Sequence, residues 1–167
     1  MKTITETKLK NILDSHKLWL ETGAKQGTRA NLKDADLSYA DLNGANLGGA
    51  NLNGANLYNA NLKDAILSDA NLRGANLTGA NLSDADLTDA DLTGANLSGA
   101  SLWGTNLTRA NLTGANLTGT ILDKDKAEKQ PEVSPCKVEN VAGTRQALEK
   151  LAKEHGFKIV SLGLELL

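Results

Sequence analysis

Large side chains are scarce in this 167-residue chain, because aromatic residues make up only 3% of it. One phenylalanine, two tyrosines and two tryptophans are too few to build the core of an ordinary globular domain of this length. The apolar fraction of 40% is nevertheless higher than disordered chains show. The composition therefore predicts a folded chain whose core consists of aliphatic side chains.

Residues that carry chemistry are equally scarce. A single cysteine, Cys136, excludes an intramolecular disulfide framework. The two histidines, His16 and His155, lie in opposite flanks, and His16 is expected to be a packed residue. These positions do not provide a nucleophile with a base and an orienting group. We therefore predict that the protein is not an enzyme and holds no cofactor or metal ion.

Long apolar runs are missing as well. The sequence contains neither an eighteen-residue apolar stretch nor the apolar region of a secretory signal. We therefore expect a cytoplasmic protein that does not associate with a membrane.

What the chain has in abundance is a five-residue repeat. From residue 30 to residue 122 every fifth residue, beginning at Leu32, is leucine, which gives nineteen repeats. The residue two before each leucine is alanine except at Thr105 and Thr120, and the residue one before is Asn or Asp except at Ile66, Ser101 and Ile121. Ten repeats end in glycine and one in Asn59, residues that accept the positive φ of a type II turn. For the others, which mostly end in Asp, the sequence allows another turn geometry.

A period of five fits neither of the common secondary structures. On an α-helix, at about 100° per residue, successive leucines would spiral around the axis without forming a stripe. In a strand, alternate leucines would point to opposite faces. A chain that turns a corner once per repeat keeps every leucine and alanine on the inside, and short internal repeats of this kind indicate a solenoid.

The repeats resemble those of the pentapeptide repeat family, through runs such as Ala70-Asn71-Leu72-Arg73-Gly74 and Ala75-Asn76-Leu77-Thr78-Gly79. The resemblance implies an all-β solenoid, a right-handed quadrilateral parallel β-helix in which four repeats make one coil. Nineteen repeats would then give just under five coils, a rod of roughly 23 Å at a spacing of ~4.8 Å per coil.

The two flanks predict additional elements. Residues 1–29 are expected to form an N-terminal helical cap, in which Thr3 and Glu6 make a capping box and the helix ends near Gly23. Its apolar face is predicted to cover the first coil, and it consists of Leu9, Ile12, Leu13, His16, Trp19 and Leu20. Residues 123–167 predict a linker followed by a helix and a strand, an α/β appendage. That strand could cover the last coil, which we favour, or join two copies of the chain as a homodimer.

Stacking at intervals of twenty residues predicts which side chains share a side of the rod. An acidic region with exposed apolar residues is expected, and so is a tyrosine pair. These candidate partner-binding residues are Ile66, Asp64, Asp84, Asp86, Asp89 and Trp103 in the first group, and Tyr39 and Tyr58 in the second. As an alternative, such polar ladders are ordinary solvated surface. A calcium site at Asp84, Asp86 and Asp89 is not expected, because these side chains would project in separate directions.

Charge helps to decide between functions. Residues 30–122 carry nine acidic and four basic groups, so direct binding of nucleic acid is not expected. We predict a non-catalytic scaffold that binds a protein partner through the solenoid surface. The alternative, suggested by the family resemblance, is a mimic of DNA that inhibits a DNA-binding enzyme such as DNA gyrase. Duplex DNA carries one charge per ~1.7 Å of its length. A net charge of −5 over a rod of roughly 23 Å is a lower charge density than that.

Overall fold

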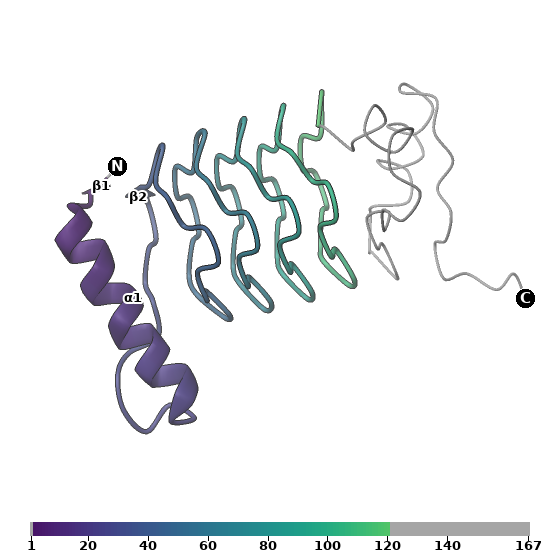
Figure 1. Cartoon of the computed structure of the whole chain (residues 1–167). Coiled ribbons are helices and arrows are strands. Elements are labelled where there is room, and N and C mark those ends of the chain that lie inside the picture. The colour runs from purple at the N-terminus through teal and green to yellow at the C-terminus, as the bar shows by residue number, and fades with distance from the viewer. Residues whose placement is uncertain (1, 121–167) are drawn as a thin grey trace, which may run out of the picture.

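The structure, a computed structural model, describes residues 2–120 of the chain. The predicted appendage, residues 123–167, lies outside the described residues, as do Ile121 and the last leucine of the repeats. Three named elements occur in the described part: strand β1 (Lys2–Thr3), helix α1 (Glu6–Glu21) and strand β2 (Ala35–Asp36). From residue 30 to residue 120 the chain winds into stacked coils (Figure 1).

The coils confirm the prediction of four repeats per turn of the solenoid. Parallel β-bridges connect residues twenty apart, from Asn31 with Asn51 to Asn96 with Asn116. Each coil both donates to the next and accepts from it: Leu52 N–H donates to the Asn71 carbonyl at 2.8 Å, and Asn71 N–H donates to the Ala50 carbonyl at 2.9 Å. We number the coils from residue 30, so that residues 30–49 are the first, 50–69 the second, 70–89 the third and 90–109 the fourth.

The core is a column of leucines with alanines beside them, as the sequence predicts. None of the eighteen leucines between Leu32 and Leu117 is more than 6% exposed. The alanines two residues earlier are also buried, except for Ala40, Ala45 and Ala115 near the two ends of the described solenoid, which are partly buried. Burial of one leucine contributes about 1.5–3 kcal/mol, so the column supplies the main stabilisation of the rod.

One turn geometry serves every described repeat, and the allowance for a second one was wrong. The last residue of each repeat has a φ between 51° and 69°, whether it is Gly, Asn, Asp, Tyr39 or Arg109. In each turn the leucine carbonyl accepts a hydrogen bond from the N–H three residues later, for example Leu72 from Ala75 at 3.0 Å. This pattern is that of a type II turn. Backbone hydrogen bonds between coils impose it even on side chains that disfavour the left-handed region.

The Asn or Asp before each leucine has a role that sequence reasoning missed. In sixteen of the eighteen described repeats its Oδ1 accepts a hydrogen bond from the backbone N–H two residues later, at 3.0–3.3 Å. This contact, an Asx turn, satisfies the N–H that points away from the neighbouring coil. The recurrence of Asn or Asp every five residues was the signal in the sequence from which this role could have been inferred. We call this position of each repeat the Asx position.

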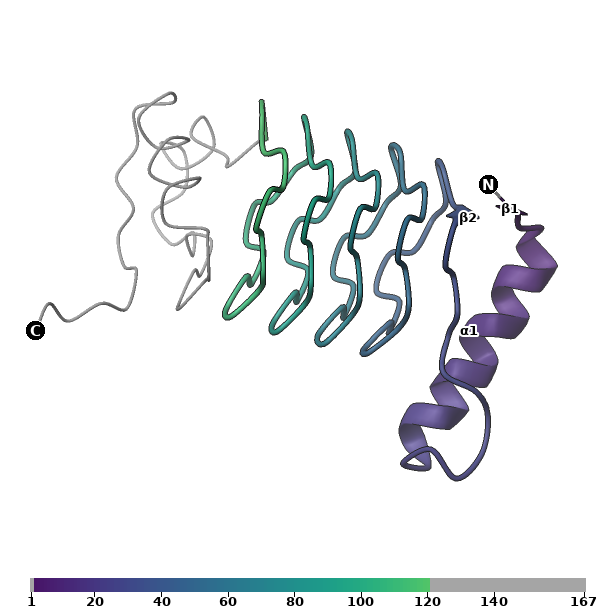
Figure 2. The same ribbon diagram turned by 180° about the vertical axis from the view of Figure 1, so that it is seen from behind.

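Helix α1 lies across the N-terminal end of the solenoid, as predicted (Figures 1 and 2). Ile4 and the predicted face residues Leu9, Ile12 and Leu13 pack against the core, and His16 is fully buried. The predicted capping box is wrong: the N-cap is Thr5, whose Oγ1 accepts from Lys8 N–H at 3.3 Å. The backbone of Thr3 instead belongs to β1, which pairs in parallel with β2 through Thr3 and Asp36.

The segment between α1 and the first repeat returns along the helix. Thr28 N–H donates to the Ser15 carbonyl at 3.2 Å, and Ala30 N–H donates to Nδ1 of His16 at 3.1 Å. These bonds fix the helix to the start of the solenoid. Within residues 2–120 no helix is long and apolar enough to cross a membrane.

Candidate functional site

One side of the solenoid carries a residue that departs from the repeat pattern and has an exposed side chain. Ile66 takes the Asx position of the last repeat of the second coil, and it bridges Asn46 in the coil before and Asp86 in the coil after. Its side chain is 40% exposed. Leu67 next to it is fully buried, so Ile66 is not needed to complete the core.

Ile66 also removes a hydrogen bond that the other repeats make. An isoleucine offers no acceptor to the N–H of Ser68, whereas the equivalent N–H of Thr88 donates to Oδ1 of Asp86 at 3.0 Å. A hydrogen bond of this kind contributes about 0.5–1.5 kcal/mol. Ile66 therefore exposes apolar surface at a position where the local structure favours Asn or Asp.

Carboxylates flank Ile66 at both corners of its side. Asp64 and Asp84 occupy the turn before this side in successive coils, and Asp69 and Asp89 occupy the turn after it. The backbone fixes the stacking: Asp64 N–H donates to the Ser83 carbonyl at 3.0 Å, and Asp69 N–H donates to the Thr88 carbonyl at 2.9 Å. We call the group formed by Ile66 with Asp64, Asp69, Asp84, Asp86 and Asp89 the Ile66 surface.

Basic side chains balance only part of this charge. Arg109 donates from Nε to Oδ1 of Asp89 at 2.6 Å, and its Nη2 contacts Oδ2 of the same carboxylate. Hydrogen bonds from Arg109 hold the pKa of Asp89 below its usual range. Lys63 Nζ lies 3.8 Å from Asp64. Asp69, Asp84 and Asp86 have no ion-pair partner among residues 2–120.

Trp103 adjoins a carboxylate of the Ile66 surface. It lies in the fourth coil on the adjoining side, whereas Ile66 lies in the second coil. The indole is partly buried, and the Trp103 carbonyl accepts from Asp84 N–H at 2.7 Å. Ser101, two residues earlier, is the second described exception at the Asx position.

Tyr39 and Tyr58 lie together, as the register predicts. Their rings meet edge to face, with centroids 5.5 Å apart, and Tyr39 N–H donates to the Tyr58 carbonyl at 2.9 Å. Tyr39 is 70% exposed and Tyr58 38%. They belong to the second repeat of the first and second coils, two repeats from the side that carries Ile66, and so lie across the four-sided coil from it.

The described residues do not assemble reactive groups. Nowhere in residues 2–120 do three His, Cys, Asp or Glu residues come close enough to hold a metal ion. His16 is enclosed between α1 and the first coil, where its ring stacks on Trp19 with centroids 5.6 Å apart. Asp84, Asp86 and Asp89 stand at a corner, a side and the next corner of one coil. The Ile66 surface provides shape, negative charge and an apolar side chain, that of Ile66.

Comparison with known proteins agrees with this geometry. The family model for pentapeptide repeats matches eight copies in the overlapping stretches 30–69, 55–94, 65–104 and 90–124, together more than half of the chain. No curated protein matches the sequence.

Solved structures of the same kind are similar to the chain. The pentapeptide repeat protein Rfr23 of the cyanobacterium Cyanothece 51142 is 40% identical over 62% of this chain and 67% of its own, with a TM-score of 0.46. A pentapeptide repeat protein of the Arabidopsis thaliana thylakoid lumen is 33% identical over 70% of this chain and 72% of its own, with a TM-score of 0.33. HetL of Nostoc sp. strain PCC 7120, a protein involved in heterocyst differentiation regulation, is 37% identical over 56% and 55%, with a TM-score of 0.28.

Proposed function

Because the chain belongs to the pentapeptide repeat family, we propose that it is a non-catalytic scaffold that binds a protein partner through its solenoid surface. Family membership implies the right-handed quadrilateral β-helix, and such a rigid rod presents side chains at fixed intervals. The observation that supports the proposal is Ile66, the exposed exception at the Asx position.

The energetics of Ile66 favour a role outside the fold itself. The residue leaves Ser68 N–H without the Asx acceptor and keeps 40% of its surface in water. Neither property stabilises the monomer, because buried apolar area and satisfied donors are what lower the free energy of a fold. Contact with a partner would bury the same side chain and recover its transfer free energy.

The charge around Ile66 indicates the kind of partner. Five carboxylates stand against Lys63 and Arg109, so the Ile66 surface is acidic in sum. An acidic rim attracts basic segments and raises the rate of encounter, while a central apolar residue supplies affinity. The partner segment we infer is basic and carries an apolar side chain that packs on Ile66.

Affinity capture with three forms of the protein tests the proposal. Ile66→Asn restores the Asx position, and Ile66→Val keeps an apolar side chain as the matched control. A protein that the parent and Ile66→Val retain at low salt, but that Ile66→Asn loses, would support the role of Ile66. Retention by all three forms would exclude this surface, and loss in high salt would reveal the contribution of the carboxylates.

The DNA-mimic alternative makes a different prediction for the same proteins. Inhibition of DNA gyrase would depend on the carboxylates and not on Ile66, so Ile66→Asn would inhibit supercoiling as well as the parent. Paired contacts already neutralise Asp89 and offset Asp64, which weakens the resemblance to a phosphate backbone. A supercoiling assay with the parent and an Asp69→Asn/Asp86→Asn double variant separates the two functions.

A further inference from the structure

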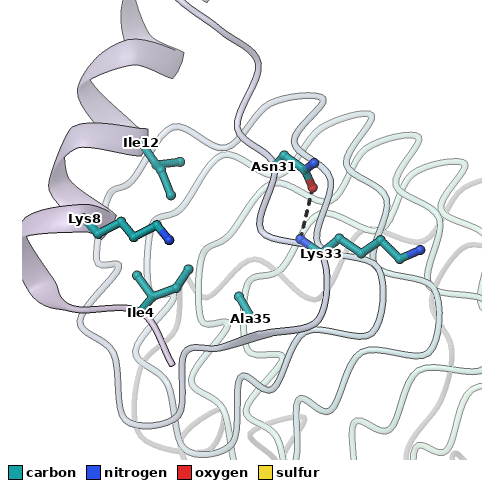
Figure 3. A pocket seen from close by; sticks show the side chains of 6 residues that line it. All are labelled: Ile4, Lys8, Ile12, Asn31, Lys33 and Ala35. Carbon is teal, nitrogen blue, oxygen red and sulfur yellow. Dashed lines mark hydrogen bonds between the residues drawn. The ribbon is translucent and has the colours of Figure 1, made fainter. Parts of the chain in front are cut away.

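A cavity of about 190 Å³ lies between α1 and the first coil, away from the Ile66 surface. Figure 3 shows the six residues that line it, three from the α1 side and three from the start of the solenoid. They are Ile4, Lys8, Ile12, Asn31, Lys33 and Ala35.

The polar groups that line the cavity offer donors and no free side-chain acceptor. Oδ1 of Asn31 already accepts from Lys33 N–H at 3.3 Å and from Nδ2 of Asn51 at 3.3 Å. The side chain therefore has its Nδ2 amide left to donate. The ammonium group of Lys8 therefore makes the lining suited to an anionic oxygen ligand.

Lys8 differs from the other two lysines of α1, because each of those has a carboxylate one helical turn later. Lys10 contacts Asp14 at 2.7 Å and Lys17 contacts Glu21 at 3.8 Å. The residue four after Lys8 is Ile12, and Lys8 has no ion-pair partner in the part of the chain that the structure describes. Its ammonium points toward the first coil between Ile4 and Ile12, whereas the Lys33 side chain points away (Figure 3).

The rest of the lining is apolar. Ile4 and Ile12 are partly buried and pack against the core, and Ala35 is 1% exposed. A purely inorganic anion would leave these side chains without a contact. A ligand that combines a carboxylate with a short aliphatic chain would contact both parts of the lining.

We propose that this cavity binds a short aliphatic carboxylate. The carboxylate accepts a hydrogen bond from Lys8 Nζ, and the aliphatic chain lies on Ile4 and Ile12. The basic N-terminal segment, with six basic and three acidic groups in residues 1–29, favours an anion at this end of the rod. A bound ligand contacts both α1 and the first coil, so binding stabilises the docked helix.

Titration with hexanoate, followed by NMR of the isoleucine methyl groups, tests the site. We expect saturable shifts of Ile4 and Ile12, and weaker binding of hexanol and acetate, each of which lacks one half of the ligand. A peptide that ends in leucine provides the same chemistry from a second source, and its titration shows whether the cavity also accepts a chain terminus. Equal binding of hexanol would overturn the proposal, as would unsaturated shifts at a ligand concentration of about 10 mM.

Two lysine variants locate the anion. Lys8→Met removes the ammonium group that enters the cavity, and we expect the affinity for hexanoate to fall about tenfold or more, the loss typical of a charge-assisted hydrogen bond. Lys10→Met is the matched control, because Lys10 pairs with Asp14, and it should bind like the parent. Equal affinity of Lys8→Met and Lys10→Met would contradict the assigned contact. Helix content by circular dichroism checks that both variants keep α1.

Discussion

Nδ1 of His16 accepts a hydrogen bond from the backbone N–H of Ala30, at 3.1 Å, in a contact that joins the N-terminal helix to the first repeat. Since Nδ1 is the acceptor, the bond requires an imidazole without a proton on this nitrogen. The ring is fully buried, and within the described residues its Nε2 has no hydrogen-bond partner. Burial lowers the pKa of His16, the Gly48 backbone opposes this shift, and Arg29 reinforces it.

The docking of α1 should therefore weaken in mild acid. The pKa of His16 is lower in the folded state than the ordinary value near 6.5, so the unfolded chain binds more protons between these two values. Stability contributed by the neutral ring is present above pH 6.5 and is lost as the pH falls. Urea unfolding followed by helix ellipticity, from pH 7 to pH 5, measures how steeply the free energy of unfolding depends on pH.

His16→Gln is the control for this prediction, because glutamine can accept from Ala30 N–H but does not titrate in the range. The shifted carboxyls Asp36, Asp89 and Asp91 have pKa values below their ordinary 3.8, so they titrate outside the window. An equal slope in the parent and in His16→Gln would show that His16 is not the group responsible.

Gly27 is predicted to be essential for the docking of α1. A Cβ at this position would lie 2.2 Å from the Ser15 carbonyl oxygen and 2.7 Å from the Trp19 nitrogen, both backbone atoms of the helix, and its φ is +73°. We expect Gly27→Ala to lower the free energy of unfolding by about 3 kcal/mol, from overpacking combined with left-handed strain. Thermal unfolding with helix ellipticity as the signal measures this loss.

Gly23→Ala separates the two causes. Gly23 has a φ of +58°, but a Cβ there would meet nothing within 4 Å. Only the conformational cost of about 1 kcal/mol is expected. Equal losses for the two variants would mean that the helix can move away from residue 27.

Ile66→Asn should make the protein more stable, whatever its effect on binding. Asparagine restores the acceptor for Ser68 N–H, and it removes an apolar side chain that is 40% exposed. The expected gain is about 0.5–1.5 kcal/mol in the free energy of unfolding. The reverse change, Asn71→Ile, removes the acceptor of Arg73 N–H and should cost a similar amount. Denaturant unfolding of both variants checks the signs, and a loss for Ile66→Asn would show that Ile66 stabilises the coil.

The sequence predicted the solenoid because each of its determinants is local and repeated. Leucine, alanine and the residue after each turn recur every five positions, so the register of Tyr39 on Tyr58 followed by counting. The Asx contacts were equally regular and could have been inferred from the same spacing.

Other features depend on contacts that are distant in sequence. Tyr39 and Arg109 adopt a positive φ because neighbouring coils fix their backbones, which a single repeat does not reveal. Thr3 and Thr5 are both plausible caps by composition, and pairing of β1 with β2, more than thirty residues away, decides for Thr5.

The C-terminal segment leads to a prediction about assembly. Val160, Leu162, Leu164 and Leu166 alternate with other residues, and we predict a strand there that covers the last coil of its own chain. Light scattering should then give a monomer for the full chain and for a truncation ending at Lys126. A dimer that becomes monomeric on truncation would assign the strand to a homodimer instead.

Arg109 is predicted to control the ionisation of Asp89 more than the stability of the rod. The ion pair joins the fourth coil to the third, and the hydrogen bonds of Arg109 lower the pKa of Asp89. In Arg109→Gln this pKa should rise toward its ordinary value, whereas the free energy of unfolding should change little, because exposed ion pairs are screened by water. Carboxyl NMR titration of Asp89 measures the first effect and urea unfolding the second. An unchanged pKa would mean that the pair does not persist in solution, and the Ile66 surface would then be more acidic at neutral pH than the paired geometry implies.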